Sequence, residues 1–166
     1  VQAIAEGLLQ QGIELVILGS GEAQYENFFN ELCARNPGRV GVYIGFNAKL
    51  AQQIYAGADI FLMPSRSEPC GLAQMVSCRY GTIPVVRETG GLKDSIRDSG
   101  DGYGNGFTFA GYNAHELYEA CWRAKEGYWQ KDGWPVLVKR AMECDFSWSN
   151  SAKSYEGLYN EVVNLW

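Results

Sequence analysis

The chain alternates between helical stretches and short apolar runs, and this alternation restricts the fold more than any other feature of the sequence. Apolar residues recur at helical spacing in one set of segments and run without interruption for four or five residues in the other. Short, fully apolar strands separated by helices are typical of a parallel sheet covered on both faces. The pattern therefore predicts an α/β fold with a doubly wound parallel sheet. The predicted strands cover 14–18, 40–44, 59–63 and 83–86, and the intervening helices cover 1–9, 23–34, 49–56 and 72–80.

The alternation stops beyond Thr89, and the end of the chain is helical. A glycine-rich loop at 101–106 precedes a short strand at 107–109, and three helices are predicted at 114–128, 134–144 and 149–164. No low-complexity segment or linker divides the 166 residues, a length suited to about one domain of roughly 150 residues. We therefore expect a single domain over 1–166 with extra C-terminal helices.

Charge and cysteine content exclude several classes of function. The net charge of −5 gives no overall attraction for nucleic acid or for an anionic membrane. No apolar run approaches the roughly 18 residues that a membrane span requires. The five cysteines include no CxxC pair, so we expect reduced thiols in a cytoplasmic protein. His115 is the single histidine; we place it on the surface beside a helix start and expect no metal site.

Three loops follow predicted strands at the sheet edge where ligands of α/β proteins bind. The first, Gly19–Gly21, resembles a dinucleotide-binding turn, but the third glycine of that motif would fall on Gln24. This departure argues against a nicotinamide dehydrogenase. The third loop contains Gly90 and Gly91, which would allow backbone to approach a ligand closely, although glycine pairs are also common in ordinary turns.

The second loop, 64–71, is the most informative segment. It brings an arginine, a carboxylate and a glycine to the end of one strand, directly before the helix at 72–80. Backbone amides of Gly71, Leu72 and Ala73 would be unpaired donors of that helix, aimed where its dipole favours an anion. The alternative is that Glu68 simply complements the helix dipole. Arg66 and Arg87 leave a similar choice, between reaching a phosphate and pairing with a neighbouring glutamate.

Several long motifs in register resemble the signature segments of bacterial glycogen synthases and plant starch synthases. They include Pro64-Ser-Arg-Ser-Glu-Pro-Cys-Gly-Leu-Ala-Gln74, Arg79-Tyr-Gly-Thr-Ile-Pro-Val-Val-Arg87, Thr89-Gly-Gly-Leu-Lys-Asp94 and Asp145-Phe-Ser-Trp148. The resemblance extends over essentially the whole chain. It implies a Rossmann-like C-terminal domain of a two-domain GT-B glycosyltransferase, the half that binds the nucleotide sugar.

The resemblance implies a reaction and a set of site residues. The family transfers glucose from ADP-glucose to the 4-hydroxyl end of an α-1,4-glucan with retention, without a cofactor or an essential metal, in the cytoplasm or, in plants, the plastid. Glu68 falls on the required glutamate beside the donor sugar. The diphosphate-binding turn falls on Cys70, Gly71, Leu72 and Ala73, with Gly90 and Gly91 closing the pocket from the neighbouring strand, and the aromatic residue that stacks on the base is Phe46.

Some features depart from the family pattern. The wider superfamily often has a second glutamate where this chain has Val76, and a threonine where it has Ala73. The basic motif that grips the diphosphate would precede Val1, and the acceptor domain is also missing. We therefore expect a fragment that lacks the acceptor domain and the first part of its own domain and is inactive alone. Two alternatives are a retaining transferase that uses UDP-glucose and a non-catalytic module that binds nucleotide sugars.

The aromatic residues near the C-terminus have two interpretations. Tryptophans and tyrosines between 118 and 148 are expected mainly in the core, with stacking on a glucan as the less favoured interpretation. The last helix would cross to the acceptor domain in a complete GT-B enzyme. Its apolar positions should then be partly uncovered and promote self-association; they are Tyr155, Leu158, Tyr159, Val162, Val163 and Trp166.

Overall fold

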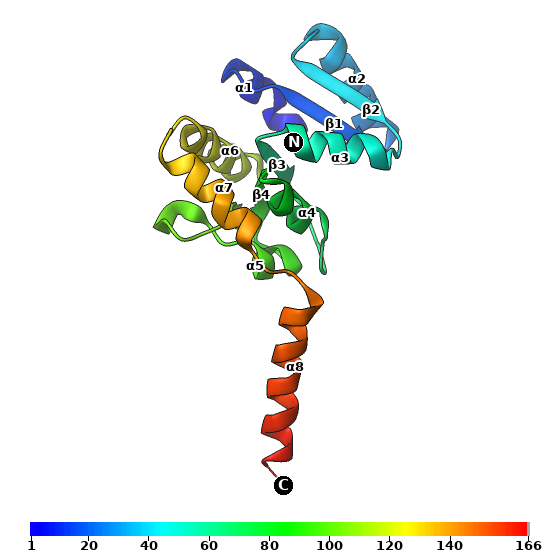
Figure 1. The fold of residues 1–166 in the computed structure, drawn as a ribbon. Coiled ribbons are helices and arrows are strands. Elements are labelled where there is room, and N and C mark those ends of the chain that lie inside the picture. Colours follow the sequence, from blue (N-terminus) through cyan, green and yellow to red (C-terminus); the bar gives the residue numbers. More distant parts are fainter. Residues whose placement is uncertain (166) are drawn as a thin grey trace.

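The computed structural model describes residues 1–165 and confirms an α/β fold with parallel strands (Figure 1). The predicted strands and most helices form within one or two residues of their expected ends. The strands are β1 (Leu15–Gly19), β2 (Val40–Ile44), β3 (Ile60–Met63), β4 (Ile83–Arg87) and β5 (Phe107–Phe109). The α-helices are α1 (Ala5–Gln10), α2 (Ala23–Arg35), α3 (Ala48–Gly57), α4 (Ala73–Tyr80), α5 (Gly91–Ser95), α6 (Ala114–Tyr128), α7 (Gly133–Glu143) and α8 (Trp148–Val163), with 3-10 turns η1 (Gln2–Ile4) and η2 (Ser99–Asp101).

The strands form two parallel sheets rather than one continuous sheet. β1 pairs with β2, with Leu15 opposite Val40, and β3, β4 and β5 form a second sheet in that order. Within residues 1–165, β1 and β3 therefore each have a partner strand on one side only. Because each of these strands lacks a second neighbour, its side chains are partly exposed. Val16 in β1 is 61% exposed, and β3 is half-buried throughout.

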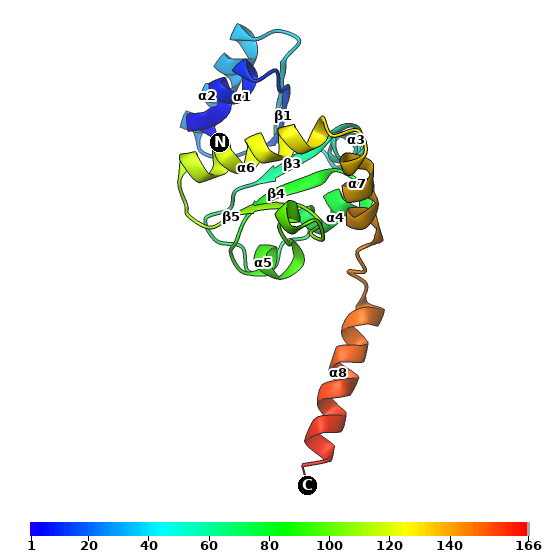
Figure 2. The same ribbon diagram turned by 90° about the vertical axis from the view of Figure 1, so that its left-hand side faces the viewer.

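The core of the molecule lies around β4, the strand with a neighbour on each side. Its first four residues are buried, because α4, α6 and α7 pack against it. In Figure 2, α6 runs along the sheet above it, and α5, which contacts α4 and β4, lies below. The hydrophobic core in and around β4 includes Ile83, Val85, Val86, Leu92, Phe107, Leu117, Ala124 and Leu137.

Asp98 joins the second sheet to the helices that follow it. Its carboxylate accepts hydrogen bonds from the amides of Thr108 at 2.7 Å and Gly100 at 2.9 Å, and from the Arg123 guanidinium at 2.9 Å. Burial alone would raise the pKa of Asp98, but these hydrogen bonds outweigh it and leave the pKa below its ordinary value. The charged form of this carboxylate therefore stabilises the fold.

The last helix, α8, stands away from the rest of the molecule in both views (Figures 1 and 2). None of its residues is buried, so its apolar positions are uncovered as expected; Trp166 lies outside the described residues. The exposed stripe consists of Tyr155, Leu158, Tyr159, Val162 and Val163. No helix within the described part combines the length and apolarity needed to cross a bilayer.

Candidate functional site

Two turns at neighbouring strand ends contain most of the predicted site residues. The first joins β3 to α4, and the second joins β4 to α5. Because β3 and β4 run parallel and are paired, their carboxyl ends meet at one edge of the sheet. Glu68, Cys70 and Gly71 lie in the first turn and Gly90 in the second, with Gly91 opening α5.

The N-terminus of α4 presents backbone donors that the protein leaves free. Within residues 1–165, the amides from Gly71 to Met75 donate to no protein acceptor, and the first hydrogen bond of the helix runs from the amide of Val76 to the carbonyl of Leu72. Gly71 has a φ of +77°, a left-handed conformation that glycine adopts without strain. This backbone turns sharply before the helix and exposes Cys70 and Leu72 to solvent. The arrangement suits an anion.

Gly90 and Gly91 lie directly against the first turn. A Cβ atom at Gly90 would be 2.1 Å from the carbonyl oxygen of Glu68, and one at Gly91 would be 2.1 Å from that of Cys70. The amide of Gly91 donates to the carbonyl of Glu68 at 3.1 Å. The two turns therefore form one interlocked unit, and glycine is needed at both positions because backbone occupies the space of a side chain. The sequence reveals the glycine pair but not its partner.

A buried glutamine beneath the first turn was missed by the sequence analysis. Gln74 is 0% exposed, although glutamine on a helix is usually solvated. Its amide nitrogen donates to the carbonyls of Cys70 at 3.3 Å and Gly71 at 2.9 Å, and to the Ser95 hydroxyl at 3.1 Å. Only the tertiary contacts show that this side chain folds back under the turn, so no sequence signal could have identified it.

The charged residues near the turns form no ion pairs with one another within the described chain. Glu68 is half-buried, and within the described chain its carboxylate has no hydrogen-bond or ion-pair partner, so it does not pair with Arg66 or Arg87. Arg87 instead donates to the carbonyls of Arg66 at 2.7 Å and Ala110 at 3.2 Å. The Glu68 carboxylate therefore remains available to a ligand.

Phe46 belongs to the other sheet. It follows β2 in a loop that is joined to the end of β1 by a hydrogen bond from the Gly45 amide to the Gly19 carbonyl at 2.9 Å. Its ring is 92% exposed, which leaves the face free to stack. The structure thus gathers seven of the predicted residues at the β3–β4 edge and places the eighth on the loop after β2.

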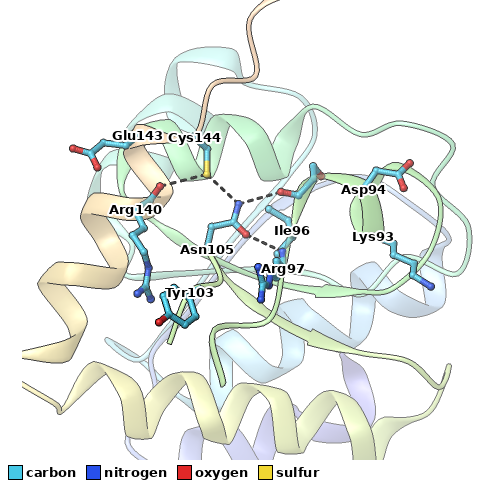
Figure 3. A pocket seen from close by; sticks show the side chains of 10 residues that line it. Lys93, Asp94, Ile96, Arg97, Tyr103, Asn105, Arg140, Glu143 and Cys144 are labelled. Carbon is cyan, nitrogen blue, oxygen red and sulfur yellow. Dashed lines mark hydrogen bonds between the residues drawn. The ribbon is translucent and has the colours of Figure 1, made fainter. Parts of the chain in front are cut away.

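A cavity of about 390 Å³ lies elsewhere, between α5, the loop before β5 and the end of α7 (Figure 3). Asn105 is at its centre; it donates to the carbonyl of Ser95 at 3.0 Å and accepts from the amide of Arg97 at 2.8 Å. None of the predicted site residues lines this cavity, which sequence reasoning missed. Its lining is mixed: Lys93, Asp94, Ser95, Ile96, Arg97, Tyr103, Asn105, Arg140, Glu143 and Cys144.

The single histidine and the aromatic residues differ in how closely they match the sequence expectation. His115 lies on the surface, 80% exposed, with Glu119 3.4 Å away. Tyr118 and Trp134 pack against the core as expected. The expectation was wrong for Trp122, Trp129 and Trp148, which are exposed because α8 and the outer side of α6 are uncovered. Within residues 1–165, no group of three or more His, Cys, Asp or Glu side chains could hold a metal ion.

Comparisons with known proteins identify the family of the chain. The family model described as glycosyl transferases group 1 matches residues 1–128. Glycogen synthases of Bacillus anthracis and Geobacillus thermodenitrificans are each 47% identical over 98% of this chain, which spans only about a third of their length (35% and 34%). The resemblance to glycogen and starch synthases is therefore confirmed.

Solved structures show the same fold. The catalytic domain of starch synthase IV from Arabidopsis thaliana, bound to ADP and acarbose, superposes with a TM-score of 0.85 at 35% identity, over 98% of this chain and 35% of that one. The Anabaena protein HepE in complex with UDP-glucose has a TM-score of 0.67 at 20% identity over 85% of this chain and 39% of that one, which shows a shared fold. The family match covers more than half of the chain, which therefore belongs to the glycosyl transferases group 1 family.

Proposed function

We propose that residues 1–166 form the donor-binding part of a glucan synthase that transfers glucose from ADP-glucose to the 4-hydroxyl end of an α-1,4-glucan with retention. The observation that carries the proposal is the set of amides at the start of α4 that have no protein acceptor, in the same β3–α4 turn as Glu68, whose carboxylate has no partner in the described chain. The starch synthase structure bound to ADP supports adenine nucleotides as the donor class.

The chemistry needs such an arrangement. When the bond between the glucosyl carbon and the diphosphate oxygen breaks, negative charge develops on ADP and positive charge on the sugar carbon. Fixed amide dipoles facing the diphosphate lower the barrier because they need no reorganisation as the charge develops. The carboxylate of Glu68 holds sugar hydroxyls and offsets the positive charge on the carbon. Phe46 stacks on the nucleobase, and no metal or cofactor takes part.

The acceptor side of the reaction belongs to a part of the protein outside this chain. The chain spans about a third of the length of its curated relatives, and we propose that the glucan binds a preceding domain of a cytoplasmic protein. Residues 1–166 alone then bind ADP-glucose weakly and show no measurable transfer.

A chimera tests the proposal directly. Residues 1–166 replace the matched segment of the Bacillus anthracis glycogen synthase, and incorporation of labelled glucose from ADP-glucose into glycogen is measured. We expect transfer by the chimera, a loss of at least ~100-fold in the Glu68→Gln variant, and full activity in Glu31→Gln, a matched control on the exposed face of α2.

Each alternative predicts a different outcome. A preference for UDP-glucose over ADP-glucose in the same chimera would replace the donor assignment. A well-folded chimera that binds ADP-glucose without transferring glucose would favour a binding module and overturn the catalytic role of this chain. Robust transfer by residues 1–166 alone would contradict the requirement for a separate acceptor domain.

A further inference from the structure

Gln74 is a fully buried polar side chain, and its burial in α4 needs a structural explanation. It lies in the first turn of α4 and is 0% exposed, among buried polar residues that include Ser77 and Thr82. Burying an amide is costly unless its polar atoms find partners. The partners that Gln74 finds belong to the two turns of the candidate site, so its environment is tied to the position of those turns.

The hydrogen bonds of Gln74 reach both turns. On the first turn, its Nε2 atom donates to the carbonyl oxygens of Cys70 and Gly71 at 3.3 and 2.9 Å. Toward the second, Nε2 also lies 3.1 Å from the Ser95 hydroxyl, which in turn donates to the carbonyl of Gly91 at 2.6 Å. The two hydrogens of one amide group are thus shared among three acceptors.

These bonds close a ring. Gly91, reached from Gln74 through Ser95, donates its amide to the carbonyl of Glu68 at 3.1 Å. Glu68 and the Cys70–Gly71 backbone belong to one turn, so the path returns to Gln74 along the chain. Gln74 therefore hydrogen-bonds directly to the first turn and to Ser95 of α5.

The oxygen end of the Gln74 amide has no hydrogen-bond partner within residues 1–165, whereas the nitrogen end donates toward both turns. The Oε1 atom is buried and has no hydrogen-bond partner in the described structure. It lies 2.6 Å from the place that a Cβ on Gly71 would occupy, so the glutamine fills the space beneath the sharp turn. A buried acceptor without a partner is destabilising, and an apolar side chain of the same shape would avoid that cost. An apolar side chain at position 74 would, however, lose the hydrogen bonds that Gln74 donates toward the two turns.

We propose that Gln74 is a positioning residue that fixes the β3–α4 turn against the β4–α5 turn, so that the free amides of α4 and the Glu68 carboxylate face one sugar diphosphate. The inference rests on the proposed function, because it assigns the purpose of the ring to donor binding. Gln74 itself touches no ligand; it acts through the backbone of Cys70, Gly71 and Gly91.

The test replaces Gln74 by methionine, which has a similar length and volume but donates no hydrogen bond. The control is Gln52→Met, the same substitution at an exposed position of α3. Hydrogen exchange of the Gly91 amide is measured by NMR in the 166-residue chain, together with the midpoint of urea unfolding. We expect exchange of this amide to accelerate at least tenfold in Gln74→Met, with little change in the unfolding midpoint and no effect in the control.

Ligand binding separates positioning from a purely structural role. We expect Gln74→Met to raise the Kd for ADP-glucose about tenfold and to leave the weak binding of adenosine, which has no phosphate, unchanged. A lower unfolding midpoint with an unchanged ratio of ADP-glucose to adenosine affinity would overturn the proposal and leave a structural role only.

The binding and hydrogen-exchange measurements test the donor assignment and the role of Gln74 separately. If the wild-type chain fails to bind ADP-glucose even at millimolar concentration, the donor assignment is weakened, and the exchange arm still decides whether Gln74 holds the turns together. If the Gly91 amide exchanges equally slowly in wild type and Gln74→Met, the positioning role is refuted whether or not the donor binds.

Discussion

Replacing Gly91 by alanine tests the interlocked turns, because helix propensity and tertiary packing predict opposite effects. Gly91 is the first residue of α5, and alanine in a helix is favoured over glycine by about 1 kcal/mol. In the structure, however, its Cβ would lie 2.1 Å from the carbonyl oxygen of Cys70 and 2.6 Å from its Cα. Both are backbone atoms, so no side-chain rotation relieves the clash.

The magnitude follows from what must move. Real Cβ atoms essentially never approach other heavy atoms within 3.0 Å, so the turns must separate by about 1 Å, at a cost of roughly 1–3 kcal/mol. The separation also breaks the hydrogen bond from Gly91 to Glu68, worth about 0.5–1.5 kcal/mol. After subtracting the gain in helix propensity, we expect Gly91→Ala to lower the free energy of unfolding by about 1–3 kcal/mol.

Urea unfolding followed by circular dichroism measures this change. The matched control is Gly57→Ala at the end of α3, where an added Cβ meets no atom within 4 Å; it should be neutral or slightly stabilising. A Gly91→Ala variant as stable as the wild type would refute the close packing of the two turns.

Three further predictions concern other parts of the chain. Asp98→Asn should lower stability by about 1–3 kcal/mol at pH 7; because the folded pKa of Asp98 is lowered, its contribution is complete above its unfolded pKa of about 3.9 and disappears as pH falls through the folded value. Urea midpoints between pH 2 and 7 should therefore converge for wild type and variant at the acidic end, and a constant gap would contradict this. Burial raises the pKa values of Cys78 and Cys121 to about 12, so iodoacetamide should modify the exposed Cys70 at least ~100-fold faster in the folded chain, and equal rates in mass spectra would disagree. The uncovered stripe of α8 should cause concentration-dependent association that Leu158→Glu reduces, and light scattering from a strict wild-type monomer would rule this out.

The strands could be predicted from the sequence because their apolar runs have an unambiguous local pattern. Predicted ranges 40–44 and 107–109 coincide with β2 and β5. The short helix α5 was missed because five residues contain too little periodicity to distinguish a helix from a turn. The division into two sheets was also missed, since the pattern identifies strands but does not determine which strands pair.

The candidate site was accessible to sequence reasoning only in part. Its residues could be identified because the turn residues and the motif order are local signals. Their mutual arrangement could not, because the contact between Gly91 and Cys70 joins residues far apart in the chain. Gln74 was missed for the same reason: a glutamine in a helix reads as solvated unless the turn that covers it is known.

The separation of the β1–β2 pair from the three-stranded sheet affects how the molecule comes apart when heated. Two ladders that share no strand are only weakly coupled, so each can melt at its own temperature. The smaller pair has only one buried residue in each strand, whereas the first four residues of β4 are buried. Mild heating should therefore release residues 15–46 first and leave the edge that carries Glu68 folded, so the exposed Phe46 would detach before the free amides of α4 do.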